Sequence, residues 1–275
     1  MARSRARKTD RAEGWSLLRG AIVVVIFAWA FRSFVFAPFT IPSGSMLPAV
    51  YIGDYVAVAK WPYGFSRYSF PFDFPSFRGR ILPNLPKRGD VVVLRPAGEQ
   101  GEDFIKRVIG LPGDTIAVRG GVVLLNGKPL RREPIQPVAI PVSENSPCRK
   151  ITAQGIAVAP GRDGQCLYRT YRETLPDGTA YRVIDQLDNP LADNLAPTRV
   201  PDGQLFLMGD NRDDSLDSRF APAEGGIGFV PVENLVGRAT TIFWSTDGSA
   251  DYLKPWTWFT ALRWGRLGSG FGGGE

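Results

Sequence analysis

The sequence predicts a mainly β protein: an antiparallel β-sheet domain with a small β-rich insertion, preceded by one transmembrane helix. Two observations support this prediction. The chain of 275 residues has a single apolar run of membrane length, close to its N-terminus. After that run helical periodicity disappears, and short runs rich in β-branched residues alternate with turns that contain glycine, proline or asparagine.

The N-terminal apolar run covers residues 15–37 and is interrupted only by Arg19 and Arg32. Roughly 20 apolar residues cross a bilayer, and both arginines can extend their charged heads to the two interfaces. We therefore expect one transmembrane helix over 15–37. A cleavable signal peptide is the alternative, because a basic start, an apolar run and Ala28-Trp-Ala30 have that form. The first chemically informative motif follows too closely to favour cleavage.

The positive charge of the chain is concentrated before and within this run. Residues 1–19 hold six basic and two acidic side chains, whereas the other 256 residues hold 27 basic and 25 acidic ones. By the positive-inside rule, the basic tail of residues 1–14 is expected in the cytoplasm and everything after residue 38 on the other side of the membrane. The near-neutral body also argues against a nucleic-acid-binding domain.

Short β-rich runs separated by tight-turn signals, such as Asn126-Gly127, are expected to form the antiparallel sheet. The expected strands are Tyr55–Lys60, Asp90–Arg95, Asp103–Ile109, Thr115–Val118, Val122–Leu125, Gln204–Met208 and Arg238–Trp244. They define one β-rich catalytic domain made of residues 38–129 and 202–253.

Three further segments complete the expected organisation. Residues 130–201 are interpreted as an inserted β-rich subdomain. Residues 61–87 are rich in proline and phenylalanine and too long for an ordinary loop, so they form either an extended hairpin or flap on the bilayer surface or part of the core. Residues 254–275 are an aromatic, glycine-rich tail that suits a membrane interface but is too polar to span it.

The chain contains no histidine, which excludes Ser-His-Asp and Cys-His catalysis and every histidine-ligated metal site. Its two cysteines are too few for a zinc cluster, and we expect neither a metal nor a cofactor. Cys148 and Cys166 are expected to form a disulfide if the domain lies outside the cytoplasm. Two unrelated free thiols are the alternative.

Ser45 and Lys106 are the candidate nucleophile and general base. Ser45 lies in Pro42-Ser-Gly-Ser-Met46, where a tight bend can expose its hydroxyl and its backbone N–H together, as acyl transfer requires. Lys106 shares one strand face with Phe104 and Val108, so it must find a carboxylate or lose its proton, and we expect its pKa to be depressed. The alternative for Ser45 is an ordinary loop, because its local sequence is a common loop composition. The alternative for Lys106 is a structural salt bridge.

A polar segment, Met208–Arg219, follows an expected apolar strand. Its acidic residues suggest a calcium loop, but its third, sixth and twelfth positions do not hold the residue types that a calcium loop requires there. We expect an ordered polar turn instead, in which Asp210 or Asp217 pairs with Arg107 or Arg219.

Taken together, these motifs resemble those of the bacterial type I signal peptidases, also called leader peptidases, in the same order and over about residues 20–265. One difference is at the N-terminus, where many members have two membrane spans. The motifs that carry the resemblance are Pro42-Ser-Gly-Ser-Met-Leu-Pro48, Gly53-Asp54, Arg88-Gly-Asp90, Phe104-Ile-Lys-Arg107, Gly110-Leu-Pro-Gly-Asp114 and Gly209-Asp-Asn-Arg-Asp-Asp-Ser215.

The resemblance implies a membrane-bound serine endopeptidase that removes signal peptides from exported preproteins. Its place would be the bacterial inner membrane, with the catalytic domain on the periplasmic side. By the same match, Ser45 is the nucleophile, Lys106 the general base, Ser43 the hydroxyl donor of the oxyanion hole and Ser215 the residue that orients the lysine. A groove for small, alanine-like substrate side chains would be formed by Ile41, Pro42, Met46, Val50, Phe104 and Ile105.

Two rival functions come from other classes. Self-cleaving repressors of the SOS response resemble this family in fold and catalytic pair, but they carry a DNA-binding domain where this chain has an apolar helix. A non-catalytic, membrane-anchored assembly factor or chaperone is the other rival. It would form no acyl-enzyme at Ser45.

Overall fold

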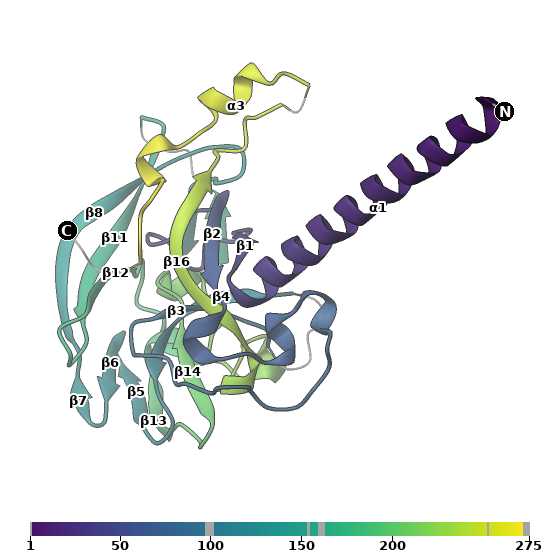
Figure 1. Ribbon diagram of the computed structural model, residues 1–275. Coiled ribbons are helices and arrows are strands. Elements are labelled where there is room, and N and C mark those ends of the chain that lie inside the picture. Colours follow the sequence, from purple (N-terminus) through teal and green to yellow (C-terminus); the bar gives the residue numbers. More distant parts are fainter. Residues whose placement is uncertain (1, 97–101, 153–154, 159–162, 252, 272–275) are drawn as a thin grey trace.

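One long helix, α1 (Ala2–Phe34), precedes a domain built of β-strands and projects away from it (Figure 1). The structure is a computed structural model that describes residues 2–96, 102–152, 155–158, 163–251 and 253–271. Within these ranges one helix is long and apolar enough to cross a bilayer, at Trp15–Phe34. Little of this segment packs against the rest of the protein, as expected of a helix that meets lipid.

The boundaries of α1 differ from the prediction at both ends. The helix already includes the residues expected as a basic tail, and it ends at Phe34 instead of residue 37. Strand β1 (Phe36–Thr40) begins immediately afterwards and pairs antiparallel with β2 (Asp54–Ala59). Pro38 lacks the N–H that a helix needs, and pairing with β2 satisfies the backbone of this segment instead.

The main sheet has seven strands in the order β1-β2-β16-β3-β4-β14-β15, and every neighbouring pair is antiparallel. The expected strands of this sheet are confirmed, with β16 starting three residues earlier than predicted. Its remaining members are β3 (Val91–Leu94), β4 (Phe104–Gly110), β14 (Gln204–Met208), β15 (Val230–Pro231) and β16 (Leu235–Ser245).

Both faces of this sheet are covered by apolar residues. In β3, Val91 and Val93 belong to one buried cluster, whereas Val92 and Leu94 belong to another. Successive side chains of a strand point to opposite faces, so an uninterrupted apolar run is stable only where both faces are buried. This explains why the strands of the main sheet read as continuous runs of valine, isoleucine and leucine.

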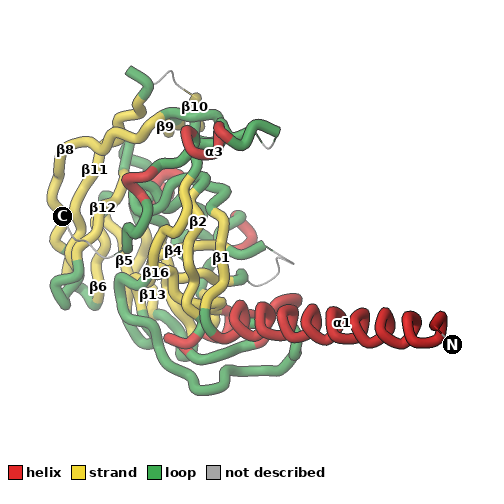
Figure 2. Tube along the Cα trace, turned by 45° about the horizontal axis from the view of Figure 1, so that its top comes forward, coloured by secondary structure: helices red, strands yellow, loops and turns green. Residues whose placement is uncertain are grey.

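Smaller sheets lie beside the main one. One has the strand order β13-β5-β6-β7, another the order β12-β11-β8, and β9 and β10 form a hairpin. In Figures 1 and 2 strands β8 and β11 lie on the side of the domain away from α1. Their bounds are β5 (Thr115–Arg119), β6 (Val122–Leu125), β7 (Lys128–Pro129), β8 (Arg131–Pro141), β9 (Arg149–Thr152), β10 (Gly155–Val158), β11 (Gln165–Thr174), β12 (Ala180–Ile184) and β13 (Leu195–Arg199).

The segment expected as an insertion, 130–201, is mostly β as predicted, but it is not separate from its surroundings. Strand β13 lies inside this range and pairs with β5, which precedes it. A short helix, α2 (Pro190–Asp193), stands just before β13. Cys148 and Cys166 form a disulfide with their Cα atoms 5.2 Å apart.

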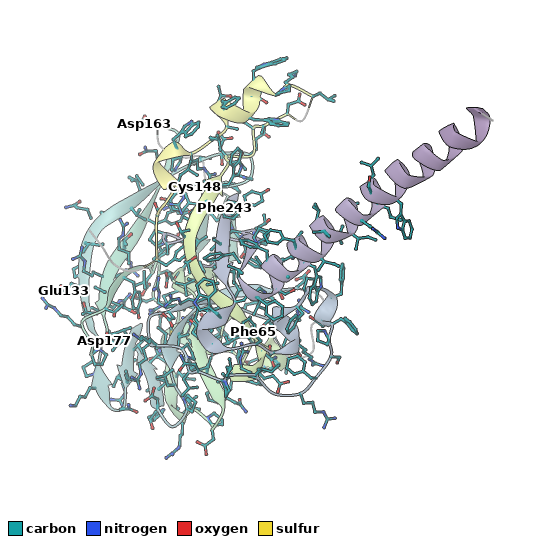
Figure 3. The ribbon with its side chains drawn as sticks, in the orientation of Figure 1. Phe65, Glu133, Cys148, Asp163, Asp177 and Phe243 are labelled. Carbon is teal, nitrogen blue, oxygen red and sulfur yellow. A yellow bond between two sulfur atoms is a disulfide. The ribbon has the colours of Figure 1, made fainter. Side chains whose placement is uncertain are left out.

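Residues 61–87 contain three short 3₁₀ turns and one isolated antiparallel bridge, between Phe65 and Ile81. The segment is partly buried in the core, and its contact with a bilayer stays a prediction. Phe70 is buried, whereas the side chains of Phe72 and Phe74 are 99% and 70% exposed. The ring of Phe34, at the end of α1, packs edge-on against Phe65 and Phe70. Figure 3 labels Phe65 below the domain end of α1, so this segment holds the base of the helix against the β domain. The described part of the tail contains a short helix, α3 (Trp256–Thr260), and a 3₁₀ turn at Trp264–Arg266.

Candidate active site

Ser45 and Lys106 meet although 61 residues separate them in the chain. Ser45 lies in the turn segment between β1 and β2, and Lys106 lies on β4. The Lys106 Nζ donates a hydrogen bond of 2.8 Å to the Ser45 Oγ. Both side chains are buried, with exposed fractions of 7% for the serine and 3% for the lysine.

The turn that carries Ser45 is fixed from two sides. On the inner side, Met46 and Val50 are fully buried in the apolar cluster beneath the sheet. On the other side, Asn211 donates its backbone N–H to the Ser45 carbonyl at 3.0 Å and its side-chain amide to the Gly44 carbonyl at 3.1 Å. Sequence reasoning missed this role of Asn211, and its only signal was the Gly209–Ser215 motif.

Burial lowers the pKa of Lys106 from 10.5 to about 8, in the direction that the sequence predicts. Loss of water around the ammonium is the largest cause. The negative charge of Asp217 opposes it, and the positive charge of Arg219 adds to it. A lysine with this pKa is partly neutral near neutral pH, so it can accept a proton.

Two buried ion pairs lie beside the lysine. Arg107 holds Asp210 with two hydrogen bonds, of 2.7 and 2.6 Å, and Arg219 contacts Asp217 at 2.9 Å. Although burial alone would raise it, the pKa of Asp217 is lowered by Arg219 and by the backbone N–H of Gly209. Burial has the largest influence on the pKa of Lys106; Asp217 and Asp210 raise this pKa, whereas Arg219 lowers it.

Ser43 and Ser215 lie beside Ser45 and Lys106, and neither forms a hydrogen bond with the lysine. The Oγ atoms of Ser43 and Ser45 are 3.4 Å apart. Ser215 is buried, and its Oγ has no hydrogen-bond partner within the described parts of the chain. It packs so closely over Gly209 that a Cβ there would overlap the Ser215 Oγ and would lie 2.6 Å from the Ser45 carbonyl oxygen.

The six residues expected to line a substrate groove are distributed unevenly. Pro42 is exposed and Phe104 partly exposed. The other four are buried together in one core cluster and form an apolar floor beneath the Ser45 turn: Ile41, Met46, Val50 and Ile105.

A β domain that follows an apolar helix and has a serine hydroxyl hydrogen-bonded to a buried lysine has the features expected of a membrane-anchored serine endopeptidase. The family model described as signal peptidase, peptidase S26, matches residues 15–244. The chain belongs to this family.

Two relatives from Rickettsia support the assignment. The chain is 37% identical to signal peptidase I of Rickettsia typhi over 231 residues, which cover 81% of this chain and 77% of the relative. It is 35% identical to signal peptidase I of Rickettsia akari over 252 residues, 89% of this chain and 83% of the relative. A solved signal peptidase I from Enterococcus faecalis is 25% identical, covers 57% of this chain and 98% of its own, and superimposes with a TM-score of 0.28.

Proposed function

We propose that this chain cleaves signal peptides from exported preproteins with Ser45 as the nucleophile and Lys106 as the general base. One observation carries the assignment of roles: the 2.8 Å hydrogen bond between the Lys106 Nζ and the Ser45 Oγ, in a buried site. A nucleophile and its base must lie within hydrogen-bond reach, and a serine needs an adjacent base because its free hydroxyl is a weak nucleophile.

In the proposed mechanism, the Ser45 Oγ attacks the carbonyl carbon of the scissile bond while neutral Lys106 takes the hydroxyl proton. The backbone N–H of Ser45 and the hydroxyl of Ser43 stabilise the resulting oxyanion. Lys106 then gives its proton to the leaving amine, which is the new N-terminus of the mature protein. Neutral again, Lys106 deprotonates a water that attacks the ester; the bond from the acyl carbon to the Ser45 Oγ breaks, Lys106 returns the proton to that oxygen, and the carboxylate of the signal peptide is freed.

Ser215 is the proposed positioning residue for the lysine. Its buried Oγ has no hydrogen-bond partner among the described residues, which leaves it available to the ammonium when Lys106 turns during the reaction. Small residues are proposed at the first and third substrate positions before the cut, since Pro42 and Phe104 supply the accessible surface above a buried apolar floor.

The proposed topology has a cytoplasmic N-terminus, one span in the bacterial inner membrane, and the catalytic domain on the periplasmic side. The charge asymmetry around the apolar helix supports this orientation. The bond between Cys148 and Cys166 is consistent with it, because disulfides persist in oxidising compartments. The lipid bilayer is then a permanent partner of the protein.

The test is cleavage of a signal-peptide-bearing preprotein by the full chain in detergent. Ser45→Ala should lower the rate by roughly a thousand-fold or more, because a missing nucleophile cannot be replaced by its neighbours. Ser249→Ala, at an exposed serine outside the site, is the matched control and should cleave normally. Equal cleavage by both variants would contradict the proposal, and no cleavage by the wild type would favour the non-catalytic alternative.

A further inference from the structure

A cavity of about 120 Å³ lies where α1 meets the β domain. Its walls include Arg32 from the last turns of α1, Lys60 from the end of β2, and Arg95 from the segment after β3. The backbone N–H of Lys60 donates to the carbonyl of Val35 at 3.0 Å, one residue beyond the membrane-length segment. The cavity is therefore at the level where lipid headgroups begin.

Lys60 is the most unusual residue of this cavity. Only 4% of it is exposed, and burial lowers its pKa to about 8, while Asp103 raises it and Arg32 lowers it further. Its ammonium makes no hydrogen bond or ion pair with any residue that the structure describes. Lys60 lines the cavity, so water or a ligand there can accept the three hydrogen bonds that its ammonium donates.

The charges around the cavity favour an anion. Arg95 is already engaged, with hydrogen bonds of 2.6 Å to Asp73 and 2.9 Å to Asp103. Together these three groups carry one negative charge, and the two remaining cations, Arg32 and Lys60, exceed it. Neither of these cations forms an ion pair with a described residue, so the cavity retains a net positive charge with two free sets of donors.

An exposed aromatic residue stands among those that line the cavity. Phe70 is buried, whereas Phe72, two residues further along the chain, is almost wholly exposed. Aromatic rings are favoured at the level of lipid headgroups, and anionic headgroups attract basic side chains there. A water-filled cleft for a soluble anion would have no need of this exposed aromatic ring.

We propose that this cavity binds the phosphate group of an anionic phospholipid headgroup, with Lys60 and Arg32 donating to the phosphate oxygens. The chemistry shared with a free phosphate ion is the tetrahedral oxyanion. The position of the cavity beside the end of the membrane-length segment and the exposed ring of Phe72 favour the lipid as the source. Bound lipid would tie the β domain to the membrane at a second point besides α1.

The experiment is native mass spectrometry of the full chain, released from detergent and titrated with phosphatidylglycerol. Lys60→Met removes the buried charge with a side chain of similar length, and lipid binding should weaken roughly ten-fold, since a hydrogen bond to a charged group is lost. Lys128→Met, at an exposed lysine of β7, makes the same charge change away from the cavity and should bind lipid like the wild type.

A second variant guards against misfolding of Lys60→Met. Arg32→Gln changes another residue that lines the cavity, at an exposed position, and it should also weaken binding. Equal lipid binding by the wild type and both cavity variants would overturn the proposal. Inorganic phosphate that binds alone and displaces the lipid, in a manner that depends on Lys60, would show a site for free phosphate and overturn the lipid as its source.

Discussion

The pKa of about 8 at Lys106 predicts a distinctive dependence of cleavage on pH. With this value, roughly one molecule in ten has a neutral lysine at pH 7, and about half have one at pH 8. The kcat/KM for a preprotein should therefore rise about ten-fold per pH unit in acid and level off above about pH 8. Raising the pH from about 8 to about 9 should add less than a factor of two.

A lysine with its ordinary pKa of 10.5 would behave differently, because the same step would raise the rate about ten-fold. The assay is cleavage of a preprotein at subsaturating concentration across this range. Asp214→Asn is a useful companion variant, since the charge of Asp214 raises the pKa of Lys106, and its loss should move the rise to lower pH. Lys106→Arg should be inactive at every pH, because a guanidinium keeps its proton.

The same pKa has a consequence for stability. Lowering it from 10.5 to about 8 corresponds to roughly 3 kcal/mol. The folded state binds fewer protons than the unfolded state between these two values, so the cost is complete below about pH 8 and disappears as the pH rises towards 10.5. Relative to Lys106→Met, the wild type should gain about 3 kcal/mol of unfolding free energy over this interval. A difference between the two proteins that is independent of pH, or an active Lys106→Arg enzyme, would refute the reasoning.

Three further predictions concern the packing of the Ser45 turn, a buried ion pair and the disulfide. Gly209→Ala should lower kcat at least ten-fold, because its Cβ would lie 2.6 Å from the Ser45 carbonyl oxygen and displace the Ser45 turn. Gly265→Ala is the control and should keep the kcat of the wild type, since Gly265 has open space around it. Arg107→Gln should cost about 3–5 kcal/mol in denaturant titrations by leaving a buried carboxylate unpaired, and a loss below about 1 kcal/mol would contradict this. Cys148→Ser should cost about 3 kcal/mol, from the 18-residue separation that the disulfide closes, and unchanged stability would contradict the estimate.

Much of the architecture could be predicted because its signals are local. The apolar run and the short valine-rich strands depend on hydrophobic pattern and turn chemistry, and the structure has them within a few residues. The predicted end of α1 is wrong because Phe36–Thr40 pairs with β2 as a strand. The local sequence around residue 37 does not contain this pairing partner. The prediction of residues 130–201 as an insertion missed a contact for the same reason. Strand β13, inside this range, pairs with a strand that precedes it by about 80 residues.

The candidate site also depends partly on the sequence and partly on the tertiary structure. The sequence by itself determined which groups were available: a chain without histidine, a serine in a tight bend, a lysine on an apolar strand and a polar turn of aspartates. Only the tertiary structure decided that Lys106 reaches Ser45, that Arg107 pairs with Asp210, and that Ser215 stands beside them without a partner among the described residues. Lys60 gave no signal in the sequence. Burial and the distances between remote strands set hydrogen bonds and pKa values, and both arise only when the chain folds.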